Sequence, residues 1–294
     1  KKHGFAFRGM QENDLIAAGA AGGLAAAFNA PLAGVIFAIE ELGREVMLRW
    51  ERQILLGVLA AGFIQVAIQG NNPYFSGHLG GGHEGGGALD NMLGWVLGCG
   101  LACGIAGGLF GRTLYLGATA FAPAKWREHI RRHPLITAAL IGILLAAIGT
   151  LYQGTLNKFV PALRGIHEAP AGLAVAKWFS TVLTYWTGTP GGIFTPSLTI
   201  GAVLGERIAV LTGLTQGTHV LVLLCMAAFL AGATQSPLTS AVVVMEMTGG
   251  QNLLFWLLIA CIFASQVSRQ FSPRPFYHAA GTRFKRQVEQ SGQK

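Results

Sequence analysis

The chain has 294 residues, of which 52% are hydrophobic and only 12% are charged, and its formal net charge is +8. Soluble domains contain about 25% charged residues, so the composition excludes an ordinary soluble protein and predicts an integral membrane protein. In a soluble chain this positive charge would indicate nucleic-acid binding. Here we attribute it to basic loops on the cytoplasmic side of a membrane and expect no nucleic-acid partner.

Apolar stretches follow one another along the chain and predict an all-α fold with helices of uneven length. Several approach the roughly 20 residues that a helix needs to cross a bilayer, whereas 236–249 is too short to cross alone. The stretches lie at 15–42, 53–70, 92–122, 134–153, 172–187, 193–212, 219–232, 236–249 and 252–271. We expect one polytopic membrane region over 15–285, preceded by a polar segment at 1–14 and followed by a tail at 286–294. The chain begins without Met, and we expect it to be the later part of a longer protein.

Basic residues gather between the apolar stretches and predict the orientation of the protein. They cluster in 43–52, in 123–133 and near the C-terminus, whereas 71–91 contains neither Lys nor Arg. Because cytoplasmic loops are richer in Lys and Arg, we place the three basic segments in the cytoplasm and 71–91 outside. The expected location is a bacterial inner membrane with a cytoplasmic C-terminus.

A short internal repeat begins near residue 29. The segment Asn29 to Glu41 matches 235–247: Pro31 corresponds to Pro237 and Glu40 corresponds to Glu246. Each copy predicts a short helix with a polar N-cap, Asn29 or Gln235, and a proline in its first turn. Transporters with inverted repeats place short helices at matching positions of two halves, and we prefer this interpretation to chance similarity.

Glu41 is the acid that distinguishes the first copy, because Met247 occupies the matching position of the second. A carboxylate at the C-terminus of an apolar helix faces the negative end of the helix dipole and should take up a proton more readily. Acids within a membrane are functional candidates. The alternative is a cytoplasmic surface acid paired with Arg44 or Arg49.

Two groups of residues could in principle bind a metal ion. His78, His83 and Glu84 lie in a glycine-rich run at 77–87, which lacks the ligand spacing and rigid frame of a metal site or a membrane enzyme. We interpret it as a flexible external loop. All four cysteines lie in apolar stretches and are expected to be buried free thiols, namely Cys99, Cys103, Cys225 and Cys261. The sequence therefore predicts neither a metal site nor catalytic residues.

A glycine turn at 188–198 opens directly into an apolar helix and contains no Lys or Arg. Gly191 and Gly192 precede Ile193 and Phe194, whose N–H groups would lie in the unpaired first turn of that helix. Such a turn is an anion site without a fixed cation. Non-helical backbone at membrane depth is tolerated where it is buried or lines a cavity, which favours this interpretation over an ordinary Gly-Pro turn.

Three segments resemble the CLC family of chloride channels and chloride/proton antiporters: 25–41, 188–196 and Arg274-Pro-Phe-Tyr277. They occur in the order of the family and at about its spacing, and the resemblance covers residues 14–285. It implies that the N–H groups of Ile193 and Phe194 bind chloride together with the hydroxyl of Tyr277. No cofactor is expected.

The resemblance also implies a proton pathway and a dimer. Glu41 matches an internal proton-transfer glutamate of the members that exchange protons, and in many pure channels this position is not acidic. The family forms homodimers through the helices that match the repeat. Apolar residues on these helices are candidate dimer contacts, namely Leu32, Val35, Leu238 and Val242.

Two loops of the family do not occur in this chain: a Gly-Ser-Gly-Ile-Pro-like loop, and a loop that carries the gating glutamate. We therefore expect the chain to supply the second half of an anion pathway. Chloride/proton antiport is the preferred function and a passive chloride channel is the alternative. A sodium-coupled carrier fits less well, because helix N-termini favour an anion. The choice among chloride, nitrate and fluoride stays open.

Overall fold

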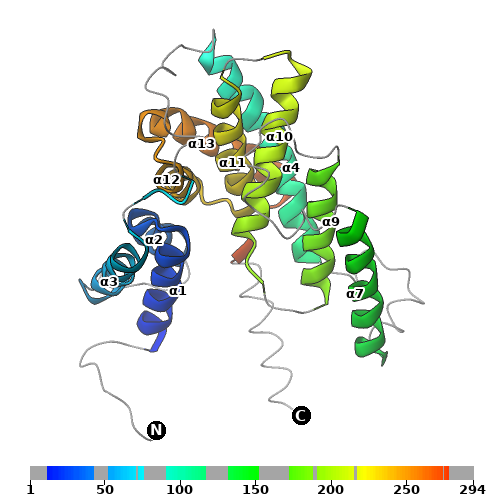
Figure 1. Ribbon diagram of the computed structural model, residues 1–294, viewed down its shortest axis with the longest axis horizontal. Coiled ribbons are helices and arrows are strands. Elements are labelled where there is room, and N and C mark those ends of the chain that lie inside the picture. Colours follow the sequence, from blue (N-terminus) through cyan, green and yellow to red (C-terminus); the bar gives the residue numbers. More distant parts are fainter. Residues whose placement is uncertain are drawn as a thin grey trace, which may run out of the picture.

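The computed structural model describes residues 12–42, 52–70, 72–75, 91–116, 132–151, 172–187, 191–214, 217–273 and 275–277. The described elements are helices of uneven length, as predicted (Figure 1). They are α1 (Glu12–Phe28), α2 (Pro31–Phe37), the π-helix η1 (Ala38–Leu42), α3 (Arg52–Gln69), α4 (Met92–Leu116), α7 (Pro134–Leu151), α9 (Leu173–Trp186), α10 (Phe194–Leu211), α11 (Thr218–Thr234), α12 (Pro237–Thr248), the 3₁₀-helix η3 (Gln251–Leu253) and α13 (Leu254–Phe271).

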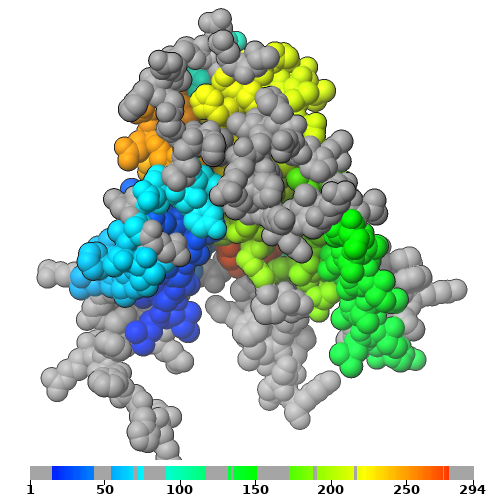
Figure 2. All heavy atoms as spheres, viewed as in Figure 1, coloured from blue at the N-terminus to red at the C-terminus, as the bar shows by residue number. Residues whose placement is uncertain are grey.

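Three helical segments of the described chain are long and apolar enough to cross a membrane: Met92–Leu116, Phe194–Leu211 and Gln251–Phe271. Shorter apolar helices accompany them, such as α12 with 12 residues. Helices α3 and α7 lie at the surface of the molecule (Figure 2). They expose large apolar side chains, as expected of surfaces that face lipid. Most residues on which the predicted orientation depends lie outside the described part, so the orientation stays a prediction.

Helix α11 forms the centre of the larger bundle, packed between α4, α10, α12 and α13. All of its residues except His219 are buried. Glycines on neighbouring helices permit the close approach: a Cβ on Gly201 of α10 would lie 2.5 Å from the carbonyl oxygen of Cys225. A Cβ on Gly107 of α4 would lie 2.6 Å from the carbonyl oxygen of Phe229. Small residues are the usual means of close helix contact in membranes.

The repeat extends over three helices on each side. α1 and α11 have 17 residues each, and α3 and α13 have 18 residues each. Between the first and second helices, Asn29 and Gln235 both adopt positive φ, +50° and +62°. The Asn29 amide donates to the Asn72 carbonyl at 2.8 Å, and the Gln235 amide donates to the Ser272 carbonyl. Each amide therefore fixes the end of the third helix of its repeat, which supports the inverted-repeat prediction.

The predicted polar N-caps of the two short helices are wrong. Pro31 and Pro237 do occupy the first turns, but the N-cap positions are taken by Ala30 and Ser236. Neither position makes a side-chain capping bond to its own helix. The physical reason is that each helix is capped from the other repeat, as described below.

One of the four candidate dimer contacts is also wrong. Val242 is only 5% exposed, because α12 packs against α2, α11 and α13 of the same protomer. Leu32 and Leu238 are 49% and 46% exposed, and Val35 is half-buried. The outward surface of the repeat is therefore formed by the first turns of the two short helices.

Candidate functional site

The start of α10 places buried backbone N–H groups ahead of the first hydrogen-bonded turn of the helix. Gly191 and Gly192 are exposed and non-helical, whereas Ile193 and Phe194 are buried. The first intrahelical bond runs from the Ser197 N–H to the Ile193 carbonyl at 3.1 Å. The N–H groups of Ile193 and Phe194 therefore precede the first bonded turn. The first turn holds no acid, and no side chain caps it, so it can receive an anion.

Tyr277 lies beside this turn although it is distant in sequence. Its ring centroid is 6.3 Å from that of Phe194. Phe37 contacts both rings, at 5.8 Å from Phe194 and 6.0 Å from Tyr277. Phe28 lies 6.1 Å from Phe194. Residues from both repeats thus meet where α10 begins.

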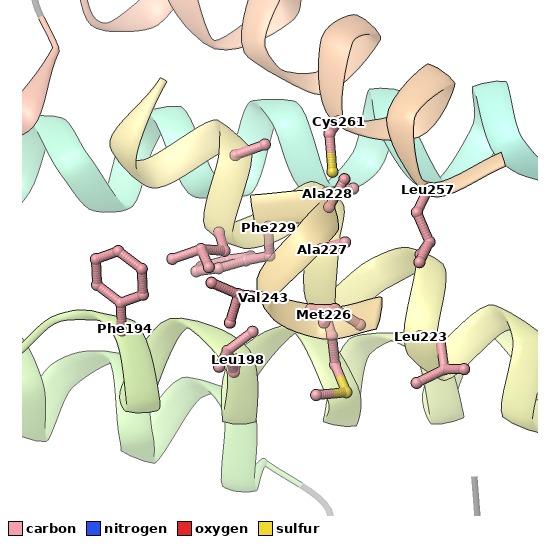
Figure 3. Packing of buried hydrophobic residues seen from close by; sticks show 14 of the residues in the cluster. Phe194, Leu198, Leu223, Met226, Ala227, Ala228, Phe229, Val243, Leu257 and Cys261 are labelled. Atoms are coloured by element: carbon pink, nitrogen blue, oxygen red, sulfur yellow. The ribbon is translucent and has the colours of Figure 1, made fainter. Parts of the chain in front are cut away.

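The sequence did not single out Phe28 and Phe37. Phe37 could have been found from its position four residues before Glu41, which places both on one side of the first repeat helix. Apolar rings around polar groups lower the local dielectric constant, which strengthens hydrogen bonds that those groups donate. Figure 3 shows Phe194 as part of the buried cluster that also includes Phe229 of α11 and Val243 of α12.

The two glutamates that match in the repeat cap each other's helices. Glu246 accepts hydrogen bonds from the N–H groups of Leu32 and Ala33 at 3.2 and 2.7 Å. Glu40 accepts bonds from the N–H groups of Leu238 and Thr239, also at 3.2 and 2.7 Å. The Thr239 hydroxyl adds a third bond to Glu40 at 2.8 Å.

This reciprocal arrangement explains how the short helices are held. Each glutamate lies near the end of its own segment and reaches the start of the other, so α2 and α12 run antiparallel, side by side. A carboxylate at a helix N-terminus faces the positive end of the dipole. Its hydrogen bonds compensate for burial of the charge. The reciprocal capping holds α2 and α12 together across the two repeats, and it fixes the position of Glu41, which directly follows Glu40.

Glu41 is buried, with 4% of its surface exposed. Its Oε2 accepts a hydrogen bond from the Ser236 hydroxyl, and it lies close enough to Tyr277 to interact electrostatically. Arg44 and Arg49 lie outside the described residues. The burial contradicts a surface position for Glu41, whereas the alternative pairing with Arg44 or Arg49 is not tested by the described residues.

The backbone around Glu41 differs from that of the second repeat. Residues Ala38–Leu42 form a π-helical turn, η1, whereas the matching part of α12 continues as α-helix. Such turns are frequent at functional sites. Met247, the counterpart of Glu41, is fully buried. The polar residue and the irregular turn therefore occur together, on the side of the repeat that faces Tyr277.

The four cysteines are buried free thiols, as predicted. Within the described ranges no group of three or more His, Cys, Asp or Glu side chains is arranged to hold a metal ion. His78, His83 and Glu84, which the sequence assigns to a flexible loop, lie outside those ranges.

Comparison with known proteins identifies the family of the chain. The family model described as "Voltage gated chloride channel" matches residues 2–269. The H(+)/Cl(-) exchange transporter ClcA of Vibrio cholerae serotype O1 is 30% identical over 278 residues, which cover 90% of this chain and 58% of that protein. ClcA of Yersinia pestis bv. Antiqua is 28% identical over 291 residues, covering 95% of this chain and 60% of that protein. The chain thus spans about three fifths of these relatives.

Two solved structures are similar. A slow cyanobacterial Cl−/H+ antiporter superposes with a TM-score of 0.70 at 25% identity, covering 93% of this chain and 66% of that one. A CLC-type fluoride/proton antiporter gives a TM-score of 0.69 at 26% identity, covering 90% and 65%. With the family model matching nearly the whole sequence, the chain belongs to the voltage-gated chloride channel family, the CLC family.

Proposed function

We propose that this chain supplies the second half of a chloride pathway in a membrane transporter. The observation that carries the proposal is the contact between the rings of Tyr277 and Phe194 at the start of α10, a helix end that no side chain caps. These groups donate hydrogen bonds without a fixed positive charge. An anion held in this way is bound firmly enough to enter and loosely enough to leave, as permeation requires.

The transport cycle is chloride/proton antiport, with Glu41 as the internal proton-transfer residue. Its burial beside Tyr277 supports this role, as does the absence of an acid at the matching Met247. The similar proteins named above as exchangers point to the same cycle. A passive chloride channel is the second candidate, because the matching family model is described as a voltage-gated chloride channel. The chain acts as a transporter rather than an enzyme.

Glu41→Gln in the complete protein tests this function. Gln keeps an oxygen that can accept from Ser236 but cannot take up and release a proton near neutral pH. In liposomes we expect proton movement to stop while chloride movement continues. Tyr277→Phe is the opposite control, since it should weaken chloride binding and leave Glu41 in place. Unchanged proton coupling in Glu41→Gln would reject antiport through this residue and favour the channel.

We also propose that the protein is a homodimer in a bacterial inner membrane, with its C-terminus in the cytoplasm. The exposed Leu32 and Leu238 at the first turns of α2 and α12 support a dimer surface there. Single cysteines at these positions should form disulfide-linked dimers upon oxidation. The native thiols are buried and should not react. Failure of both cysteine variants to cross-link, while the protein still transports chloride, would place the interface elsewhere.

A further inference from the structure

Ser236 occupies the N-cap position of α12 but does not cap that helix. It is buried, and its hydroxyl donates to the Glu41 carboxylate instead. The backbone of Ser236 is fixed on both sides: its N–H donates to the Thr234 hydroxyl at 3.3 Å, and its carbonyl accepts from the Ser240 N–H at 3.1 Å. The hydroxyl is therefore held by the second repeat and aimed at the proton-transfer candidate of the first.

The symmetry of the repeat shows that the frame of the fold does not require this polar pair. The counterpart of Ser236 is Ala30, and the counterpart of Glu41 is Met247, both fully buried. The capping glutamates are kept in both halves, yet the neighbouring residues are polar at one junction of the two repeats, Ser236 with Glu41, and apolar at the symmetry-related positions, Ala30 and Met247. Apolar residues thus suffice for packing at the equivalent place. The serine and the glutamate, one from each repeat, together mark the junction that we assign to the proton.

We propose that Ser236 is a positioning residue for the Glu41 carboxyl group, an inference that rests on the proposed antiport. A serine hydroxyl has one donor and two acceptor lone pairs. It donates to Glu41 when the carboxyl is ionised. When Glu41 takes up a proton, the hydroxyl rotates and accepts a hydrogen bond from the acid. Ser236 neither gains nor loses a proton in this sequence.

The consequence is that Glu41 keeps one partner in both protonation states. In the described part of the chain, the groups facing the carboxyl include Ser236, at the N-cap position of α12, and Tyr277, in the segment after α13, with Glu40 adjacent on η1 and engaged in capping. Without the hydroxyl, the carboxyl loses its link to α12 and its fixed direction beside Tyr277. Proton transfer depends on that direction, whereas the N–H groups at the start of α10 do not. Loss of Ser236 should therefore separate the two fluxes.

The experiment measures chloride and proton fluxes in liposomes that contain the full-length protein. Ser236→Ala should lower proton flux about tenfold, corresponding to one lost hydrogen bond of ordinary strength, with chloride flux changed by less than about twofold. Ser236→Thr keeps the hydroxyl and should restore coupling. Ser240→Ala is the matched control, because the Ser240 hydroxyl bonds the Ser236 carbonyl on its own helix. It should leave the proton-to-chloride ratio unchanged.

Several outcomes would overturn the proposal. A wild-type flux ratio in Ser236→Ala would do so, as would a parallel loss of both fluxes that Thr does not rescue. If Ser236→Ala does not fold, Ser236→Thr is compared with Ser236→Val, because Thr and Val have the same shape and differ only in a hydroxyl against a methyl group. Equal flux ratios in these two variants would then overturn the proposal. Glu41→Gln measured in parallel distinguishes a failure of the role of Ser236 from a failure of the proposed antiport. If it abolishes proton flux while Ser236→Ala and Val do not reduce it, only the role of Ser236 fails; if it leaves proton flux intact, the antiport itself fails.

Discussion

The reciprocal caps predict a specific loss of stability when either glutamate is neutralised. Glu40→Gln or Glu246→Gln leaves one oxygen to accept from two backbone N–H groups, and turns an NH₂ group toward the other donor. A hydrogen bond to a charged group contributes about 1.5–3 kcal/mol, and charge at a helix terminus contributes up to about 2 kcal/mol when partly buried. Because these terms overlap, we expect a total loss of about 2–4 kcal/mol in the free energy of unfolding.

Thermal unfolding in detergent micelles measures this loss. A change of 1 kcal/mol shifts Tm by roughly 2–4 °C in domains of 150–250 residues, so each variant should unfold roughly 5–15 °C below the wild type. Glu40→Gln should be the more damaging, because the Thr239 hydroxyl also donates to Glu40. Glu41→Gln is the control: Glu41 is also a buried carboxylate, its hydrogen bond from the Ser236 hydroxyl is not a backbone cap, and Gln can still accept from Ser236.

The pattern across the variants is as informative as the size of the shift. Wild-type Tm values in both capping variants would refute the reasoning, because the two carboxylates would then not hold α2 against α12. A lower Tm in only one of the two variants would show that the two caps contribute unequally to stability although their geometries match. A shift in Glu41→Gln as large as in the capping variants would mean that loss of any buried carboxylate, rather than loss of capping, destabilises the protein.

Two further predictions follow from the geometry of the helices. Tyr277→Phe keeps the ring contacts but removes one hydrogen-bond donor, which contributes about 1 kcal/mol. Calorimetry should therefore show a roughly fivefold higher Kd for chloride. An unchanged Kd would mean that Tyr277 does not bind chloride. Gly201→Ala should lower Tm, because its Cβ would collide with the Cys225 carbonyl. Gly149→Ala, which has open space around the new Cβ, should leave Tm unchanged or slightly higher. Equal Tm values in the two variants would show that α10 can move away from α11.

Local chemistry explains what could be predicted at the anion site. The start of a helix at Phe194 follows from the glycine turn before it and from the apolar run after it, and its unpaired N–H groups follow from helix geometry. The aromatic enclosure could not be predicted in this way. Phe28 and Phe37 are ordinary apolar residues of ordinary apolar helices, and only the packing of both repeats against α10 distinguishes them from core residues.

The repeat also has features that the sequence predicts and features that only the packing of the helices shows. The match of Glu40 with Glu246 indicates a shared task, but neither sequence copy shows that each glutamate binds the other copy's helix. The expectation of polar N-caps failed for this reason, because capping came across the structure instead of from Asn29 and Gln235. The third helices of the two repeats, α3 and α13, were not matched from the sequence, since both are apolar helices whose sequences carry little that can be aligned.

The sequence by itself determined the membrane setting, the helical class, the family and the start of the helix that we propose as the anion site, because these depend on composition and on residues close together in the chain. Only the tertiary structure decided that Glu41 is buried, that Ser236 contacts it and that Tyr277 lies beside Phe194. Each of these contacts joins segments that are far apart in sequence. Their formation depends on the antiparallel packing of two repeats, a property that no single segment of the chain contains.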